Sequence, residues 1–381
     1  MTSSLRRFAL ECAVVLAAAV LSGCGAGDGS KEYEAARAAC AVRDFRKAEK
    51  FLSESIRLAP RNVDALVLAA RVKIDLGEMA EATDYVEKAK SIAGGDADVR
   101  MLDAYVAYYA QEYARAIKTF EGISADATLD AKVRSQALSG VGVVEMARNE
   151  IDLARIAFLK AARVDRRNPA AWYHLGQLYH RLGYSEAALE QFDIFVRLED
   201  TASKRVQDVQ RTVIPRIKDE IARQAAERPG ASTRDSSASG RSIAEAESAW
   251  KKGHYKTAKT AYLAAYASDP LSYPAALGVA KAMEKTDATA EGRKKTFEYL
   301  KAACSLRPSA ISTFLKTCDM AMKLGHYATA VEIYSRALAA DPSNFMIVDG
   351  LIRALRKTGG ADRAKTASAY QAYRDLITKK R

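Results

Sequence analysis

An alanine recurs along this chain at a nearly constant interval, and in all copies but the last an aromatic or aliphatic residue follows it by four positions. The steps are 34, 34, 38 and 34 residues, then 70, 72 and 34, and the alanines are Ala48, Ala82, Ala116, Ala154, Ala188, Ala258, Ala330 and Ala364. This interval accommodates a helix, a turn and a second helix. One such unit cannot bury its own apolar face, so the sequence predicts a stack of units with a continuous core.

The clearest copy of the repeat is `AWYHLGQLYHRLGYSEAALEQF`. It resembles the tetratricopeptide repeat, whose first helix carries W-x2-L-G-x2-Y, because it places matching residues at Trp172, Leu175, Gly176, Tyr179, Gly183, Ala188 and Phe192. Several other copies end in the expected proline, at Pro60, Pro270, Pro308 and Pro342. The resemblance implies an all-α fold, an α-solenoid of helix-turn-helix repeats in two blocks.

The chain divides by composition and repeat register into six parts. We expect a signal peptide over 1–23, a lipidated cysteine and tether over 24–28, a first array of about five repeats over 29–202, a capping helix over 203–227, a flexible linker over 228–242, and a second array of about four repeats with a basic C-terminal helix over 243–381. We expect a lengthened turn in the seventh unit. The alternative is one continuous superhelix with a looped-out insertion.

The predicted capping helix has one apolar stripe, formed by Val206, Val209, Val213, Ile217 and Ile221. These residues recur at steps of three and four, which is the helical period. Pro215 lies inside this stripe and predicts a kink, because proline removes a backbone donor from the helix. The linker that follows is rich in serine, glycine and charge.

The N-terminal segment predicts a membrane attachment. Arg6 and Arg7 precede an uncharged apolar run, Cys12 to Leu21, which is too short to span a bilayer. The sequence Leu21-Ser22-Gly23-Cys24 then resembles the lipobox of bacterial lipoproteins, which implies that Cys24 carries a covalent lipid such as palmitate and begins the mature protein. The alternatives are an ordinary secretory signal, or a buried N-terminal helix with a chance cysteine.

The residues after Cys24 indicate which membrane of the cell envelope the protein would occupy. Gly25 and Ala26 follow it, and an aspartate, which favours inner-membrane retention in enterobacterial lipoproteins, is absent from these positions. The resemblance therefore implies a lipoprotein of the cell envelope that faces the periplasm, in the outer membrane rather than the inner. No other apolar stretch approaches 18 residues, so we expect no second membrane segment.

The sequence carries few signals for catalysis or cofactor binding. His174 and His180 lie six residues apart, which points them to different sides of a helix, and His254 and His326 lie in equivalent turns far apart in sequence. The H-E-x-x-H, G-x-S-x-G, P-loop and C-x-x-C motifs are absent. We therefore expect a protein that is not an enzyme, with no metal and no cofactor apart from the lipid on Cys24.

The remaining cysteines allow two interpretations. Cys304 and Cys318 lie on neighbouring predicted helices, where a disulfide would form in an oxidising compartment. The alternative, which we favour, is that Cys40, Cys304 and Cys318 act as small buried hydrophobic residues, because stacked helix pairs do not need disulfides.

The first helix of each unit supplies the candidate binding residues. In the tetratricopeptide family this face lines a concave groove that binds partner segments. The register places there Tyr105, Tyr108, Tyr109, Met146, Tyr173, Gln177, His180 and Arg181 in the first array, and Glu247, Trp250, Lys251 and Met322 in the second. We expect the Tyr105, Tyr108 and Tyr109 cluster to face solvent as binding anchors. The alternative is that some of these aromatic rings pack as core.

The chain is basic, with a formal net charge of +12, and residues 351–381 contain nine Lys or Arg against two acids. Behind a lipoprotein signal, such a C-terminus suits anionic lipid, an acidic wall polymer or an acidic protein surface. Alternatively, it is a solvated end without a specific partner.

Three functions follow from these features. The first is a lipid-anchored envelope scaffold or adaptor that binds segments of partner proteins in its groove and supports the assembly of envelope complexes. The second is a regulatory docking lipoprotein for a peptidoglycan synthase or hydrolase. The third, a cytoplasmic basic repeat protein that binds nucleic acid, requires the signal to be false, so nucleic acid is not the expected partner.

Overall fold

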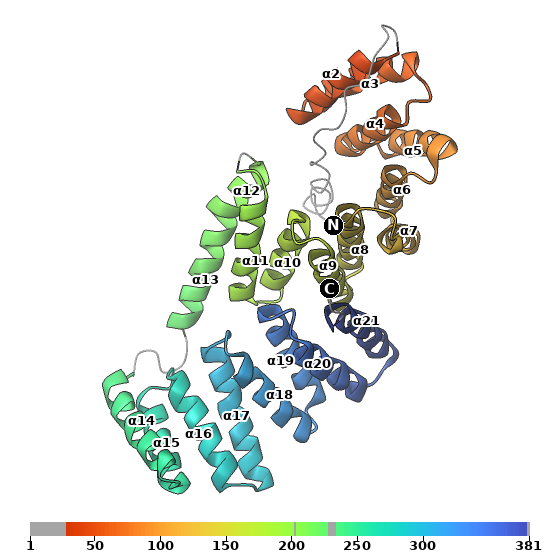
Figure 1. Ribbon diagram of the computed structural model, residues 1–381. Helices are drawn as coiled ribbons and strands as arrows, with labels where there is room; N and C mark the ends of the chain where they lie inside the picture. The colour runs from red at the N-terminus through yellow and green to blue at the C-terminus, as the bar shows by residue number, and fades with distance from the viewer. Residues whose placement is uncertain (1–27, 202, 228–233, 379–381) are drawn as a thin grey trace. The chain divides into compact units, whose positions relative to one another are not determined.

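A computed structural model describes residues 28–201, 203–227 and 234–378 of the chain, and every regular element in these ranges is helical (Figure 1). The predicted all-α solenoid is therefore confirmed. The predicted signal peptide and Cys24 lie outside the described residues. In the part that is described, no helix combines the length and the apolar character needed to cross a membrane.

Five helix pairs form the first array. Their helices are α2 (Ser30–Ala41), α3 (Phe45–Leu58), α4 (Val63–Leu76), α5 (Met79–Ala93), α6 (Ala97–Tyr109), α7 (Tyr113–Ala125), α8 (Ala131–Ala147), α9 (Ile151–Val164), α10 (Pro169–Arg181) and α11 (Ser185–Leu198). From α2 to α9, each helix packs against the next one in sequence. We call the earlier member of each pair its first helix and the later member its second helix.

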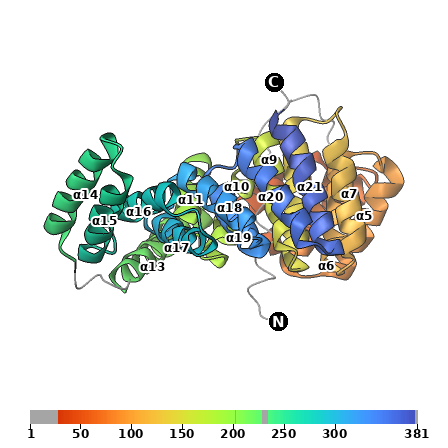
Figure 2. The same cartoon turned by 90° about the horizontal axis from the view of Figure 1, so that it is seen from below.

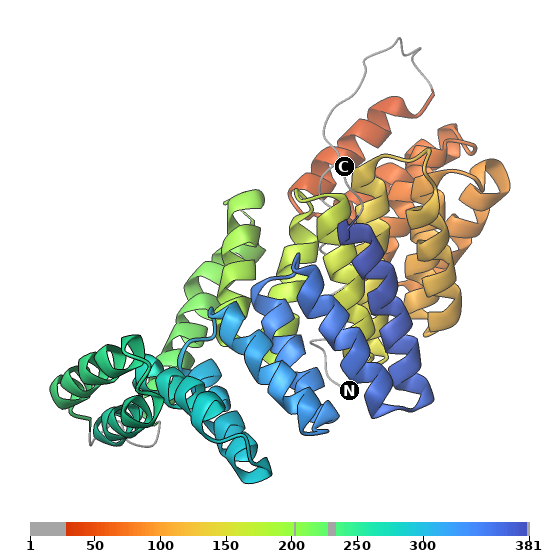
Figure 3. The same cartoon turned by 60° about the horizontal axis from the view of Figure 1, so that its bottom comes forward.

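Four helix pairs form the second array. Their helices are α14 (Ser236–Lys251), α15 (Tyr255–Ser268), α16 (Tyr273–Thr286), α17 (Ala290–Leu306), α18 (Ile311–Lys323), α19 (Tyr327–Ala340), α20 (Phe345–Thr358) and α21 (Ala361–Thr378). Each helix again packs against its neighbour in sequence, and the succession from α14 to α17 can be followed in Figure 2 and Figure 3.

The turn inside most pairs has the same backbone conformation. One residue per turn has a positive φ, between 59° and 80°, and these residues are Arg43, Gly77, Gln111, Asn149, Gly183, Gly253 and Gly325. The next N–H in each turn donates to the carbonyl five residues earlier, as Glu78 does to Lys73, which is the Schellman ending of a helix. These turn residues follow the same steps as the alanines, so the sequence repeat corresponds to a backbone repeat.

The seventh unit, α16 with α17, has a different turn. Asp287 accepts hydrogen bonds from the backbone and the hydroxyl of Thr289, and the Thr289 hydroxyl in turn accepts from the N–H of Gly292 at the start of α17. Side chains thus replace the Schellman hydrogen bonds here. The predicted lengthened turn is wrong, because residues 287–289 make this turn as short as the others, and the extra residues of the unit lie in α17, which has 17 residues against 14 in α15 and α19.

The repeated alanines lie where two helices meet. From Ala48 to Ala330, all seven have a relative exposure of 0%. The eighth assignment is wrong, because Ala364 is exposed and Ala367 and Tyr370 are buried instead. The preceding turn contains Gly359 and Gly360, both with positive φ, and lacks the Schellman hydrogen bond of the other turns. Helix α21 therefore turns a different side towards the core.

Glycines on first helices lie against aromatic rings of second helices. A Cβ atom added to Gly142 would lie 2.4 Å from the Phe158 ring, and one added to Gly176 would lie 2.9 Å from the Phe192 ring. Both phenylalanines are buried. The missing side chain thus makes room for the ring, and this contact fixes how closely the two helices approach.

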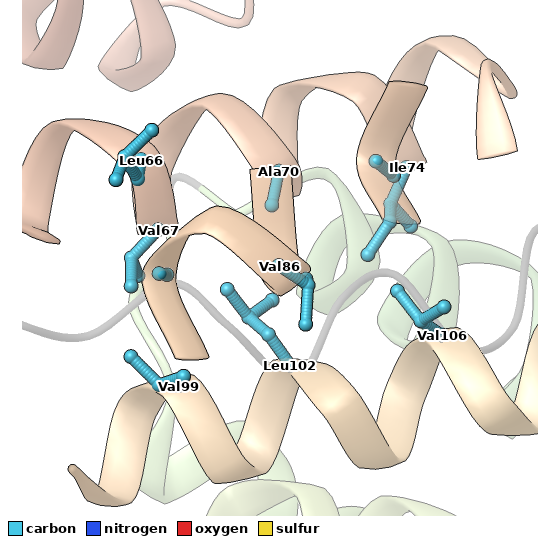
Figure 4. Close-up of a cluster of buried hydrophobic side chains, with 10 residues drawn as sticks. Leu66, Val67, Ala70, Ile74, Val86, Val99, Leu102 and Val106 are labelled. Carbon is cyan, nitrogen blue, oxygen red and sulfur yellow. The ribbon is translucent and has the colours of Figure 1, made fainter. Parts of the chain in front are cut away.

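Aliphatic side chains fill the space between successive units. In one cluster, drawn in Figure 4, Leu66, Val67, Ala70 and Ile74 of α4 meet residues of two other helices, namely Val86 of α5 and Val99, Leu102 and Val106 of α6. All are buried. Because α4 and α6 belong to different units, the core continues from one unit to the next, as the repeat predicts.

The predicted capping helix is continuous but irregular. It comprises α12 (Lys204–Asp208), the π-helical segment η2 (Val209–Val213) and α13 (Ile214–Ala226), which packs on α11. The Ile214 N–H donates to the Val209 carbonyl, five residues earlier. A π-turn directly before Pro215 is the local distortion that the proline predicts, because proline cannot donate to the preceding turn.

The boundary of the predicted linker needs correction. Residues 236–242 were expected to be flexible, but they form the first two turns of α14. The Asp235 carboxylate accepts from the Ala238 N–H and caps the helix, which outweighs the serine-rich composition. The described residues also divide into two compact parts, and the boundary between His174 and Leu175 lies within α10 rather than in the predicted linker.

Candidate functional site

Several first helices of successive units touch one another. Contacts join α4 with α6 and α6 with α8 in the first array, and α14 with α16 and α18 with α20 in the second. Among the described residues, no second helices of successive units approach as closely. The first helices therefore form the more tightly packed side of each stack, and their outward surface is called the first-helix face below.

Three tyrosines of the first helix α6 make contacts with other aromatic rings. The Tyr105 ring meets Phe120 edge-on, with 5.2 Å between ring centroids, and Tyr108 contacts both Tyr109, at 5.1 Å, and Tyr113, at 6.3 Å. Each of the three predicted anchors is half-buried rather than solvent-facing, which corrects the expectation. Burial raises the pKa of Tyr108, and the nearby Tyr113 adds to this effect.

The reason for this burial differs between the three tyrosines. Tyr105 packs against the core clusters on both sides of α6, so it joins two units. Tyr108 packs on the cluster towards α7 and α8, and Tyr109 packs on the cluster towards α4 and α5. Tyr105 is thus a core residue in part, whereas Tyr108 and Tyr109 lie at the edge of the core.

The other candidates of the first array lie on α8 and α10. Met146 is half-buried in the last turn of α8. On α10, Tyr173 and Gln177 are half-buried and Arg181 is exposed. The neighbouring His174 is buried, and its ring stacks on Phe158 at 5.1 Å. His174 is therefore a core residue, and it points away from the side of α10 that carries His180, as the six-residue spacing predicts.

His180 has a partner that the sequence did not reveal. Its Nε2 atom lies 3.0 Å from the Glu220 carboxylate on α13, and Arg216 lies 3.4 Å from the same carboxylate. The hydrogen bond from His180 is the largest cause that lowers the pKa of Glu220. The capping helix therefore covers this candidate residue, and Arg216 and Glu220 continue the polar surface beyond α10. No repeat register sets the position of the capping helix, so the sequence could not predict this pair.

The candidates of the second array are more open. Trp250 is half-buried, and its ring meets Tyr255 edge-on with 4.9 Å between centroids. Glu247 and Lys251 are exposed, and Met322 is half-buried. Tyr255, the first residue of α15, was not among the predicted residues, yet 36% of its surface is exposed.

A charged cluster lies apart from the first-helix face. Carboxylates of Glu49, Glu78 and Glu81 converge on the ammonium group of Lys73, at 2.5 Å for Glu49 and 2.7 Å for Glu78. Burial lowers the pKa of Lys73, but the hydrogen bonds to the three glutamates outweigh burial and raise it. The lysine thus occupies the position that a cation would need, and the cluster joins α3, α4 and α5.

The described cysteines are free thiols. Cys304 and Cys318 are buried, and the Cys304 sulfur lies 3.1 Å from the hydroxyl of Thr317. Burial raises the pKa of Cys304 to about 11 and raises that of Cys318 as well. In this structure they pack as small apolar groups, which agrees with the favoured interpretation, and Cys40 is half-buried.

The chain belongs to the tetratricopeptide-repeat family. One sequence model described as "Tetratricopeptide repeat" matches residues 39–104, and a second matches residues 142–202 and 243–308, which together cover about half of the chain. The structure extends the same helix pairs beyond these ranges, through α18 to α21. Proteins of this family generally serve as non-enzymatic scaffolds for protein interactions.

Several solved structures are similar to parts of this chain at low sequence identity. They include PilF from Pseudomonas aeruginosa (17% identity, TM-score 0.40, 52% of this chain and 90% of that one), MamA from Desulfovibrio magneticus RS-1 (20%, 0.35, 47% and 100%) and the Cut9–Hcn1 complex (15%, 0.38, 93% and 80%). A search of curated proteins found no match.

Proposed function

We propose that this protein is a lipid-anchored adaptor of the cell envelope, which binds segments of partner proteins on its first-helix face and so supports the assembly of envelope complexes. The observation that carries the proposal is the edge-on pair of Tyr108 and Tyr109 on α6, whose rings are half-buried at the edge of the core. Such rings supply contact area at a low cost in conformational entropy, as interface anchors do.

The envelope part of the proposal depends on the N-terminal sequence. Leu21, Ser22, Gly23 and Cys24 follow a short apolar run and two arginines, and this arrangement suits lipid attachment at Cys24. A lipid would hold the repeats next to a membrane surface without a spanning helix. The Cys24→Ala variant should move from the membrane fraction to the soluble fraction. If it stays in the membrane fraction like the wild type, the anchor is excluded.

The binding part is tested by partner recovery. We expect the Tyr108→Ala/Tyr109→Ala double variant to lose partners that the wild-type protein recovers after crosslinking in the envelope, as identified by mass spectrometry. Tyr105 is left intact because it packs between two units. The matched control is Tyr266→Ala/Tyr299→Ala, which removes two half-buried tyrosines that contact each other edge-on and lie on the second helices α15 and α17.

The two variants separate binding from stability. Both remove half-buried rings, so circular dichroism should show a similar modest loss of thermal stability for each. Only the α6 double variant should change the set of recovered partners. The same partner loss in Tyr266→Ala/Tyr299→Ala, or an unchanged partner set in the α6 double variant, would contradict the assignment of the binding face.

A further inference from the structure

Each first helix of the second array carries a lysine in its last turn. These residues are Lys251 on α14, Lys285 on α16, Lys323 on α18 and Lys357 on α20. All four are exposed. They follow one another at steps of 34, 38 and 34 residues, which is the spacing of the repeat itself. We call these four residues the lysine row.

The row lies along one edge of the array. Three of the lysines, Lys251, Lys323 and Lys357, stand two residues before the positive-φ residue of their turn. Helices α14 and α16 touch, and so do α18 and α20. Because every first helix ends at the same edge of the stack, the four ammonium groups follow that edge. The helices can be traced in Figure 1.

Most of the row has no partner within the array. Lys323 pairs with Asp319 at 2.6 Å, but both side chains are more than half exposed, so the pair is weak. Among the described residues, Lys251, Lys285 and Lys357 form no ion pair. These three charges are therefore available to a ligand.

Helix stabilisation alone does not explain the row. A lysine in the last turn of a helix interacts favourably with the helix dipole, by about 0.3–1 kcal/mol. That benefit would apply equally to the first array. The equivalent positions there hold Ala41, Asp75, Tyr109, Ala147 and Arg181. The lysine at this position is a property of the second array.

Apolar side chains accompany two of the lysines. Trp250 precedes Lys251 and Met322 precedes Lys323, and both are half-buried on the first-helix face. Arg356 stands at the same place beside Lys357, and Glu284 stands beside Lys285. Two of the four positions thus pair an apolar group with a lysine, which suits a peptide that carries acidic and apolar side chains. A purely anionic polymer would leave Trp250 and Met322 without a complement.

We propose that the lysine row is a docking site for an extended, acidic segment of a partner protein, with carboxylates opposite the lysines and apolar side chains over Trp250 and Met322. The proposal rests on the proposed function, because it names the chemistry of one partner segment. Carboxylate contacts of this kind set the orientation and the rate of binding more than the final affinity.

The test uses the full-length protein and a synthetic fluorescent peptide in which glutamate alternates with leucine. The triple variant Lys251→Gln/Lys285→Gln/Lys357→Gln should bind this peptide more weakly by roughly tenfold, because three exposed charge pairs are lost. The control variant Lys256→Gln/Lys294→Gln/Lys365→Gln removes three exposed lysines from second helices. It changes the net charge equally and should bind nearly as the wild type does.

Three further measurements decide the assignment. A peptide with glutamine in place of glutamate should bind weakly to the wild type, and added salt should weaken binding of the glutamate peptide. Equal losses in the two triple variants would overturn the proposal. So would row-dependent binding to phosphatidylglycerol vesicles without binding to the peptide, which would assign the row to a membrane surface.

The docking proposal for the lysine row and the proposed adaptor function are tested by different experiments, so either can be refuted without the other. Partner recovery with the Tyr108→Ala/Tyr109→Ala variant reports on the first array alone. If that variant loses partners and the peptide does not bind the row, the adaptor function stands and the row is not its docking site. If the peptide binds the row while partner recovery is unchanged, the row stands and the tyrosine face is excluded.

Discussion

At the scale of single residues, Asp75 of the first array has an unusually high pKa for a carboxyl group. It lies in the last turn of α4, at the position that holds a lysine in the second array. Burial raises the pKa of its carboxyl to about 7, although Arg43 and Arg71 act in the opposite direction. A carboxyl that is hard to ionise destabilises the folded state wherever the unfolded chain would ionise it.

The Asp75→Asn variant should therefore change how stability depends on pH. The pKa of Asp75 is higher in the folded state, at about 7, than the unfolded value of 3.8. The carboxyl group therefore contributes stability at pH values below 3.8, and this contribution is lost as the pH rises towards about 7. The variant should have the higher melting temperature at about pH 8, and the difference should shrink as pH falls towards about 4. Thermal unfolding followed by circular dichroism checks this. Asp84→Asn, on the exposed surface of α5, serves as the control, and an equal response from it would refute the explanation.

At the scale of elements, a contact between glycine and an aromatic ring sets the spacing of a helix pair. Helix α8 has two such contacts, because Gly140 meets Phe120 of α7 and Gly142 meets Phe158 of α9. Each ring thus lies over a gap on the surface of α8. The same helix is therefore held from both sides, and its position depends on the absence of two side chains.

Adding one methyl group at this contact should destabilise the fold. In Gly142→Ala, the new Cβ atom would lie 2.4 Å from Phe158, so ring and helix must separate, at a cost of about 1–3 kcal/mol. Gly240→Ala on α14 is the matched control, because its added Cβ meets no atom within 4 Å. That change should be neutral or stabilise the helix by up to about 1 kcal/mol. Denaturant unfolding compares the two, and equal effects would show that packing against the ring is unimportant.

The sequence predicted the elements better than it predicted the binding face. Spacing located the helix pairs and seven buried alanines, because a repeat forces equivalent residues into equivalent places. It failed at Ala364, where two consecutive glycines change the turn. It also treated the α6 tyrosines as exposed, although Tyr105 contacts two core clusters. Whether a side chain on this face is exposed to solvent depends on how the neighbouring unit packs against it. The spacing of the repeat does not contain that information.

At the scale of the whole molecule, contacts are made between neighbours. From α2 to α9 and from α14 to α21, each helix packs mainly on the helices just before and after it, and several first helices also touch the next first helix. Stability in such a stack is a sum of contributions from units and from their interfaces. A defect in one unit should therefore weaken that unit and its neighbours, and leave remote units intact.

Leu66→Ala is a direct test of this locality. Leu66 is fully buried between α4, α5 and α6, and truncation should cost about 2–5 kcal/mol locally. Hydrogen exchange read by mass spectrometry should show faster exchange in peptides from α4 to α6 and unchanged exchange in peptides from α18 to α20. Uniformly faster exchange along the chain would show instead that the arrays unfold as one cooperative body.

The neighbour-only contacts also determine how the chain acquires its structure. Partners in the core are separated by tens of residues at most, as Leu66 and Val106 are, so little chain entropy is lost before a contact is gained. Chains of such low contact order fold quickly, and folding can begin at any unit and spread to the next. Each helix pair can therefore fold against its predecessor while the rest of the polypeptide is still being synthesised.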